Sequence, residues 1–183
     1  MEPLSLILRR FTPKDLAKVV YINRKCLPEN YSESFFMQLH RSFPEAFLVA
    51  DDGGDVVAYI MCRVERGFFG SPKRGHVISI AVLPQHRRKG IAYALMVEAM
   101  KALHALGAEE CYLEVRVSNK PAISLYEKLG FKIDRRVHGY YLDGEDAYIM
   151  RRKLPLEDEI LNRPMRGISR GINPPRSVEG GNE

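Results

Sequence analysis

Apolar residues recur along this chain with two different periods, which predicts a mixture of helices and strands. Between residues 91 and 106 the apolar side chains return every three or four positions, as on the buried face of a helix. These side chains are Ile91, Leu95, Ala99, Ala102 and Leu106. Residues 76–83 are nearly all apolar and precede Pro84, a pattern typical of a buried central strand. A second strand is predicted over residues 110–117, and a short helix follows from Ser118 to about residue 129.

The remaining periodic segments surround this strand, helix, strand and helix unit. Further strands are predicted over residues 4–9, 46–51, 56–64, 131–137 and 146–152, and further helices over residues 13–25 and from Ser32 to about residue 40. Asp52-Gly53-Gly54-Asp55 lies between two of the extended runs, which is the turn chemistry of a β-hairpin. The pattern therefore predicts one α/β domain over residues 1–154.

The last 29 residues have a different character. Residues 155–183 hold four Pro and four Gly, contain no aromatic residue and show neither period, so this segment is predicted to be a disordered tail. The pattern leaves open whether residues 156–161 form one amphipathic turn against the domain.

Cysteine usage and hydropathy narrow the protein class. Cys26, Cys62 and Cys111 are far apart and include no Cys-x-x-Cys pair, which favours neither a disulfide framework nor a zinc cluster. The N-terminus has no signal-peptide pattern, and no window approaches the roughly 18 apolar residues of a membrane span. A cytoplasmic protein that binds no metal and no membrane is expected.

The charge pattern indicates an anionic ligand. The chain has 28 Lys and Arg against 23 Asp and Glu; four of these cations and five of these acids lie in residues 155–183, which leaves 24 against 18, a surplus of +6, for the domain. Three cations, Arg87-Arg88-Lys89, precede Gly90 at the start of the predicted helix. Cations destabilise a helix N-terminus, where backbone amides favour an anion. This pattern suggests a phosphate-bearing ligand, while a lone basic loop with one glycine is by itself more often a solvated turn. The loop matches neither a Walker motif nor a dinucleotide-binding motif.

The residues that carry a family resemblance lie in and after this loop. Arg87-x-x-Gly90-x-Ala92 resembles the pyrophosphate motif of the GNAT acyltransferases. Their second cofactor motif is similar to the set Asn119, Ala122, Leu125, Tyr126, Leu129, Gly130 and Phe131. Residues 27–31, 75–82 and 140–148 further resemble the catalytic subunits of NatA-type protein N-terminal acetyltransferases in their archaeal form. The resemblance spans roughly residues 4–154. It implies the GNAT fold, a mixed central sheet splayed between two parallel strands and flanked by helices on both faces.

The resemblance implies acetyl-CoA as co-substrate, without a required metal. The pantetheine and acetyl group are expected on the backbone of Ile80, Ala81 and Val82. The pyrophosphate is expected at Arg87, Arg88, Lys89, Gly90, Ile91, Ala92 and Tyr93. Asn119 is expected to contact the cofactor, and Tyr126 to lie near the sulfur as a donor to the leaving thiolate. Without the neighbouring Asn119, the residue pattern would favour an aromatic packing residue at Tyr126.

The resemblance also implies catalytic and substrate residues. An α-amine, with a pKa of about 7.7 to 8.0, needs only a carboxylate or histidine acting through water as base. Glu29 and His76 are expected to share that work, although alone they read as a surface acid and a core histidine. The slot for the substrate's first residues is expected to be lined by Tyr31, Ile80, Tyr140 and Tyr141. Glu114 is expected on the strand beside His76. These two residues alone do not make a zinc site, so no metal is predicted there.

The leading interpretation is an enzyme that transfers the acetyl group of acetyl-CoA to the α-amine of protein N-termini. The amine is expected to attack the thioester directly, without an acetylated intermediate on Cys26. The ribosome and an auxiliary subunit are candidate partners, and the preference for the substrate's first residues stays open. One alternative is a related acetyltransferase for a lysine side chain, a polyamine or one ribosomal protein. The other is a nucleic-acid-binding module that uses the +6 charge; the chain lacks the aromatic and basic interleaving of a single-strand platform.

Overall fold

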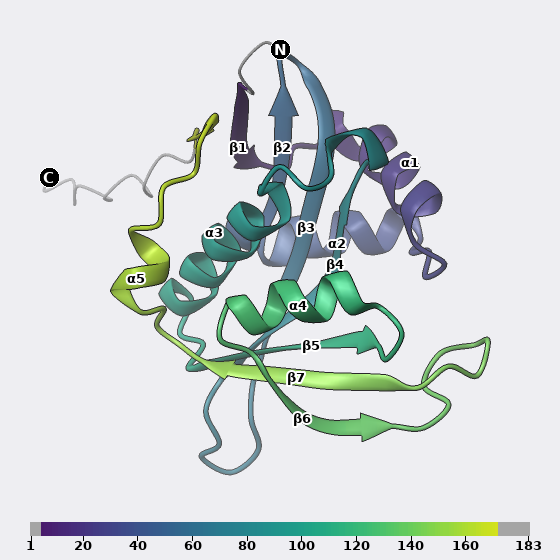
Figure 1. Ribbon diagram of the computed structural model, residues 1–183, viewed down its shortest axis with the longest axis vertical. Helices are drawn as coiled ribbons and strands as arrows, with labels where there is room; N and C mark the ends of the chain where they lie inside the picture. Colours follow the sequence, from purple (N-terminus) through teal and green to yellow (C-terminus); the bar gives the residue numbers. More distant parts are fainter. Residues whose placement is uncertain (1–4, 172–183) are drawn as a thin grey trace, which may run out of the picture.

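The computed structural model of the protein describes residues 5–171. Its centre is an eight-stranded mixed sheet with the order β6-β7-β5-β4-β3-β2-β1-β8. The strands are β1 (Leu6–Arg10), β2 (Phe47–Asp52), β3 (Asp55–Glu65), β4 (Arg74–Val82), β5 (Glu110–Arg116), β6 (Lys132–Val137), β7 (Ala147–Lys153) and β8 (Ile168–Arg170). The α-helices are α1 (Leu16–Cys26), α2 (Glu33–Ser42), α3 (Ile91–Ala105), α4 (Lys120–Lys128) and α5 (Asp158–Leu161). Figure 1 shows helices on both sides of the sheet, with α3 and α4 in front and α2 behind.

The sheet opens at its centre, between the parallel strands β4 and β5. These strands pair at only three positions, from Arg74 with Glu110 to His76 with Tyr112. Beyond His76 the two strands separate, and in Figure 1 β1–β4 stand upright while β5, β7 and β6 cross below them. A bulge bends β4 at the same level, because Ile78 has no partner in its register with β3. Because the pairing with β5 ends at His76, the backbone of β4 from Ile78 onward has no strand partner on the side that faces β5.

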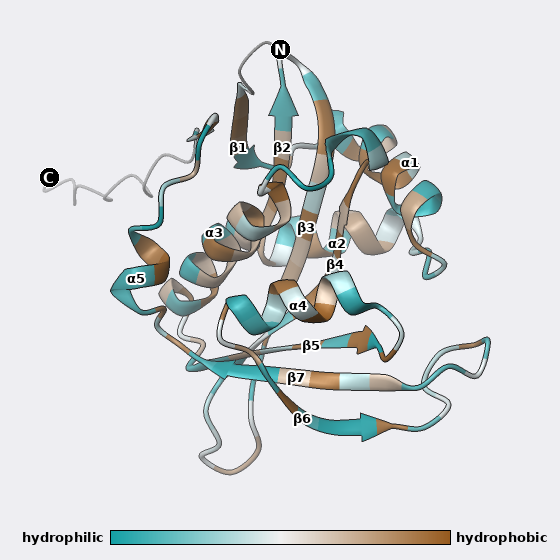
Figure 2. Ribbon diagram, viewed as in Figure 1, coloured by the Kyte–Doolittle hydropathy of each residue, from teal (hydrophilic) through white to brown (hydrophobic). Residues whose placement is uncertain are grey.

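The hydrophobic core lies between the sheet and its helices. Strand β3 is buried without interruption from Val56 to Cys62, which fits a strand covered on both faces. Helix α3 packs on the β2–β4 part of the sheet, and Figure 2 shows its apolar residues along the helix. Gly75 lets β4 approach α3 closely, because a Cβ there would lie 2.7 Å from the Leu103 side chain, which would have to move. Close contact between β4 and α3 fixes the loop that joins them.

The predicted elements are present, and their ends agree with the structure to within about two residues over the described range. The first predicted helix begins with a 3-10 turn, Pro13–Asp15, in which the Asp15 carboxylate accepts a hydrogen bond from the Thr12 backbone N–H at 2.8 Å. The predicted hairpin joins β2 to β3. The predicted fold class, a splayed mixed sheet flanked by helices, is confirmed.

The prediction of a disordered tail is wrong for residues 162–171, and the turn that was left open over residues 156–161 is formed by α5. Leu156 is buried, and the buried Arg152 forms an ion pair of 2.9 Å with Glu157. Strand β8 then pairs in parallel with β1, at the edge of the sheet. A pattern search misses this segment because β8 is only three residues long and has two exposed positions. We call residues 162–171 the C-terminal strap; residues 172–183 lie outside the described residues.

Candidate functional site

A cleft of about 1600 Å³ follows the opening of the sheet. Its walls come from β4, the first turn of α3, β5 and α4, together with the loops at residues 26–31 and 140–142 and part of the strap. Residues 86–90, which we call the basic loop, line the cleft at one end, and Glu29 lines it at the other. It therefore joins two regions that the sequence predicted separately, the anion site and the substrate slot.

The basic end has the backbone conformation of an anion cradle. Arg88 and Gly90 both adopt left-handed conformations, with φ of 61° and 80°. Left-handed residues before a helix turn successive amide groups toward one point, where an anion binds. The Arg87 side chain turns back, and its Nε donates to the Val82 carbonyl at 2.9 Å. The space beside Gly90 is open, since a Cβ there would have no neighbour within 4 Å. These features fit a pyrophosphate on the backbone amides.

The exposed edge of β4 lies between the two ends of the cleft. Ile78 and Ile80 are half-buried and line the cleft, as do Ala81 and Val82. The hydroxyl of Tyr31 donates to the Ile78 carbonyl at 3.3 Å, which ties the loop after α1 to the bulge. A free strand edge of this kind binds an extended ligand through backbone hydrogen bonds, as the pantetheine arm of acetyl-CoA requires.

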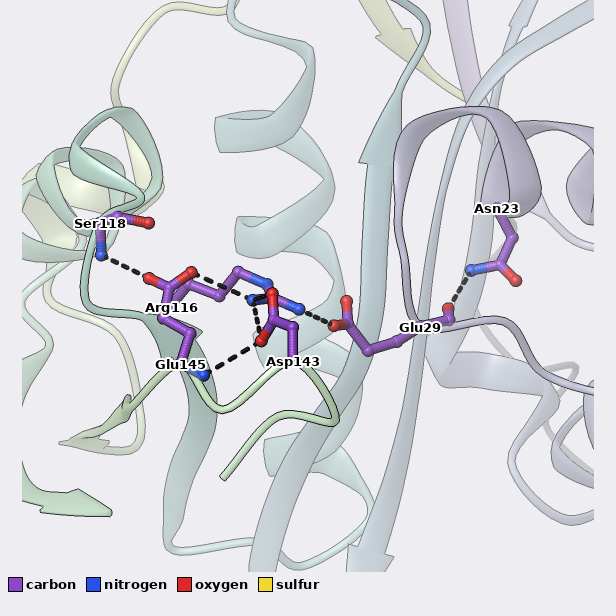
Figure 3. A network of polar contacts seen from close by, with 6 residues as sticks. All are labelled: Asn23, Glu29, Arg116, Ser118, Asp143 and Glu145. Carbon is purple, nitrogen blue, oxygen red and sulfur yellow. Dashed lines mark hydrogen bonds and ion pairs between the residues drawn. The ribbon is translucent and has the colours of Figure 1, made fainter. Parts of the chain in front are cut away.

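Glu29 is held in the cleft by an arginine from the end of β5. The Nη2 atom of Arg116 lies 2.6 Å from Glu29 Oε1, and its Nη1 lies 2.9 Å from Asp143 and 3.0 Å from Glu145 (Figure 3). The guanidinium also stacks on the Tyr141 ring at 4.0 Å. Burial lowers the pKa of Arg116, but its hydrogen bonds to the three carboxylates raise it more, so the residue stays charged. Arg116 thus fixes Glu29 and the 140–145 loop together.

A second contact fixes the backbone of the Glu29 loop. Asn23, fully buried at the end of α1, donates to the Glu29 carbonyl at 3.0 Å and to the Tyr59 hydroxyl at 3.1 Å. Its side-chain oxygen accepts from the Tyr31 backbone N–H at 3.2 Å. Tyr59 in turn lies 2.6 Å from the Ser79 hydroxyl on β4. The amide of Asn23 therefore sets the position of the loop relative to the sheet.

His76 lies behind the cleft wall. Its Nε2 lies 2.7 Å from Glu114, which does line the cleft, and its Nδ1 lies 3.0 Å from Glu65. The imidazole stacks on the Tyr112 ring at 4.2 Å, and the Tyr112 hydroxyl donates to Glu65. Burial raises the pKa of Glu65, but hydrogen bonds from Tyr112, Arg63 and His76 outweigh burial and lower it to about 2. His76 thus lies between two carboxylates, and Glu114 is its contact with the cleft.

The predicted tyrosines gather around the same end of the cleft. Burial, and then the charges of Glu114 and Glu29 among other neighbours, raise the pKa of Tyr31 and of Tyr140. Burial and the Glu29 charge raise the pKa of Tyr141 as well. All three hydroxyls therefore stay protonated at neutral pH and can donate hydrogen bonds.

Asn119 and Tyr126 come from α4 on the opposite wall. The Asn119 side chain caps α4 by accepting from the Ala122 N–H at 3.3 Å, so it has a structural role besides the one predicted. Tyr126 is buried, and burial raises its pKa to about 12. Both residues line the cleft with Ile80 and the basic loop. The structure therefore gathers the predicted site residues around one cleft, with only His76 set behind its wall.

Sequence reasoning missed Arg116, Tyr112 and Glu65. The signal for the first two was present, because β5 alternates between buried and half-buried positions and places Tyr112, Glu114 and Arg116 on one face. A strand with three polar side chains on one face, next to the predicted ligand site, indicates more than solvent exposure. Glu65 carries no comparable signal, since its contact with His76 depends on the β3–β4 register.

Comparison with known proteins decides the family. The model of the acetyltransferase (GNAT) family matches residues 16–131. The chain belongs to the GNAT acetyltransferase family. This family member is 52% identical, over 143 residues, to a protein of Sulfurisphaera tokodaii named N-alpha-acetyltransferase; the match covers 74% of this chain and 86% of that protein. It is 41% identical to the N-terminal acetyltransferase A complex catalytic subunit NAA10 of Arabidopsis thaliana, covering 80% of this chain and 77% of that protein.

The architecture of this acetyltransferase also matches solved structures. Ard1 from Thermoplasma volcanium superposes with a TM-score of 0.74 at 32% identity, covering 83% of this chain and 99% of that one. Within residues 5–171, none of the helices combines the length and the apolar character needed to cross a lipid bilayer. The same residues contain no group of three or more His, Cys, Asp or Glu arranged to hold a metal ion.

Proposed function

We propose that this acetyltransferase moves the acetyl group of acetyl-CoA to the α-amino group of protein N-termini. The observation that carries the proposal is the cleft itself, which joins an anion cradle at Gly90 to a pair of carboxylates, Glu29 and Glu114, along the free edge of β4. Membership of the GNAT family, and similarity to proteins named N-alpha-acetyltransferase, support the same activity.

The cofactor end is assigned to the predicted residues. The amides of residues 88–93 would hold the pyrophosphate, and the backbone of Ile80, Ala81 and Val82 would hold the pantetheine arm. When bound, acetyl-CoA supplies an acetyl thioester at the point where β4 and β5 separate. Tyr126 keeps its proton at neutral pH, since burial raises its pKa to about 12. We assign it as the donor to the leaving thiolate.

The acceptor end is assigned to the two carboxylates. The amine nitrogen forms the new bond to the acetyl carbon, and the carbon–sulfur bond breaks. An N-terminal ammonium group loses two protons on the way to the amide, one before the attack and one after it, while the leaving thiolate gains one from Tyr126. Glu29, fixed by Arg116, would orient the amine and take its proton through water. Glu114 would take a proton as well and share it with His76, whose other ring nitrogen faces the ionised Glu65. His76 would thus act through Glu114 as a positioning residue, without touching the substrate.

The tyrosines are assigned to the peptide. Tyr31 and Tyr140 lie near both carboxylates, and Tyr141 is fixed by its stacking on Arg116. Together with Ile80 they would bind the first residues of the substrate, with their hydroxyls donating to its backbone. Which residues are preferred depends on the width of this slot.

A peptide panel tests the proposal. Peptides with a free α-amine and no lysine should be acetylated, and peptides with a blocked α-amine and one lysine should not. Glu29→Gln should lower kcat/KM by about 100-fold, a magnitude typical of a lost general base. Equal activity on both peptide classes would favour acetylation of lysine side chains, and acetyl-CoA binding without any transfer would favour a binding module.

Partners and location belong to the same proposal. Several relatives are named as subunits or complexes, among them the NatB acetyltransferase complex, whose structure is 32% identical with a TM-score of 0.72. We propose that this chain works in the cytoplasm, with an auxiliary subunit or the ribosome as its partner. Co-purification of the tagged protein with ribosomes, at low and high salt, tests that association.

A further inference from the structure

The C-terminal strap lies against the basic end of the cleft. Arg163, Pro164, Met165 and Arg166 line the cleft together with the residues of the basic loop. The Arg163 guanidinium lies 5.0 Å from the centre of the Tyr93 ring, in the first turn of α3. The sequence pattern had assigned this segment no role, and the resemblance ends before it.

The strap is anchored on both sides of these arginines. Before them, Arg152 holds Glu157 in an ion pair of 2.9 Å, and Leu156 is buried. After them, β8 pairs with β1, and the Gly171 N–H donates to the Leu8 carbonyl at 2.8 Å. Arg170 also forms an ion pair of 2.6 Å with the buried Glu98 of α3. The middle of the strap is therefore held in place over the start of α3.

The two arginines at the cleft have no charge partner among the residues that the structure describes. Within residues 5–171, neither Arg163 nor Arg166 forms an ion pair, whereas the neighbouring Arg152 and Arg170 both do. Two more cations beside Arg87, Arg88 and Lys89 concentrate positive charge at this end of the cleft. Both side chains are exposed, and their charge strengthens the positive field at this end of the cleft, which favours a ligand with more negative charge than the cradle at Gly90 alone would bind.

Coenzyme A carries such a second group. Besides the pyrophosphate, it has a phosphomonoester on the ribose 3′ oxygen, with a charge of about −1.5 to −2 at neutral pH. We propose, on the basis of the function proposed above, that Arg163 and Arg166 of the strap bind this 3′-phosphate. The strap then makes the enzyme selective for coenzyme A esters over their 3′-dephospho forms. Guanidinium groups suit this task, because their paired N–H donors match phosphate oxygens.

Binding measurements with two ligands test the subsite. Dissociation constants for acetyl-CoA and for 3′-dephospho-acetyl-CoA are measured by titration calorimetry at low salt, for the wild type and for Arg163→Ala/Arg166→Ala. The double variant should bind acetyl-CoA about tenfold more weakly, since charged hydrogen bonds to phosphate are lost. Its affinity for the dephospho ligand should change by less than about twofold, because that ligand lacks the partner group.

The matched control removes two cations elsewhere. Lys132 and Arg135 of β6 are exposed, lie outside the cleft and form no ion pair with a described residue, so Lys132→Ala/Arg135→Ala should leave both constants unchanged. Equal weakening for both ligands in the strap variant would overturn the 3′-phosphate assignment, as would no weakening at all. Wild-type protein that binds neither ligand would overturn the proposed function and the subsite with it.

Discussion

Truncation of Asn23 tests whether the fold positions the Glu29 loop, residues 27–31, through one buried amide. Asn23→Ala removes three hydrogen bonds, to the Glu29 carbonyl, the Tyr59 hydroxyl and the Tyr31 N–H. At roughly 1 kcal/mol for each bond, the free energy of unfolding should fall by about 3 kcal/mol. For a domain of this size the melting temperature falls by about 2–4 °C per kcal/mol, so a decrease of about 6–12 °C is expected.

The assay combines thermal unfolding with kinetics far below the melting temperature. Because Glu29 and Tyr31 belong to the released loop, kcat/KM should fall at least about tenfold at a temperature where the variant is folded. Asn30→Ala is the matched control, since Asn30 is an exposed asparagine of the same loop, and its effect should stay within about 0.5 kcal/mol. Equal stability of the two variants would refute the role of Asn23 in stability. A destabilised Asn23→Ala with unchanged kcat/KM would refute its role in positioning the loop.

Three further predictions concern pH, cofactor binding and thiol chemistry. The folded-state pKa of Glu65 is lowered from 4.5 to about 2. Its contribution to the free energy of unfolding is therefore present above pH 4.5 and is lost as the pH falls toward 2. When the free energy of unfolding is measured against pH, Glu65→Gln should show a smaller decrease than the wild type over this range. Arg88→Glu should weaken acetyl-CoA binding in a titration without changing which peptides are acetylated; altered selectivity would contradict the separation of the two ends of the cleft. Burial raises the pKa of the Cys62 and Cys111 thiols. Mass spectrometry after brief alkylation should therefore find only the half-buried Cys26 modified. Because Cys26 lines the cleft, bound acetyl-CoA should protect it from alkylation.

Local signals were enough to predict most of the fold. The Asp52-Gly53-Gly54-Asp55 turn carries its own backbone preference, and α3 carries its buried face in a four-residue repeat, so neither depends on distant contacts. The short helix α4 was predicted from Ser118 onward, and the structure makes Asn119 its N-cap, a role that the sequence analysis had not assigned. The left-handed Gly90 before α3 belongs to such a local motif as well, and it lines the cleft as the prediction expected.

What the sequence could not predict depends on distant pairing. Strand β8 exists because Ile168 lies beside Leu6 at the far end of the chain, a pairing for which three residues give no periodic signal. The position of Arg116 is similar, because its three carboxylate partners come from residues 29, 143 and 145. His76 was predicted to share with Glu29 the role of a base acting through water, yet the β4–β5 register places Glu114 between it and the cleft.

The two carboxylates of the acceptor end differ in what lies behind them, and this difference bears on how a proton leaves the site. Glu29 is backed by Arg116, whose raised pKa means that it neither accepts nor releases a proton near neutrality. A proton on Glu29 can therefore leave only through water in the cleft. Glu114 is backed by His76, whose other ring nitrogen faces Glu65, a carboxylate that its low pKa keeps ionised. On the proposed assignment, Glu29 orients the amine and passes its proton to water in the cleft, whereas a proton on Glu114 is shared with His76 behind the cleft wall, where the negative charge of Glu65 stabilises it.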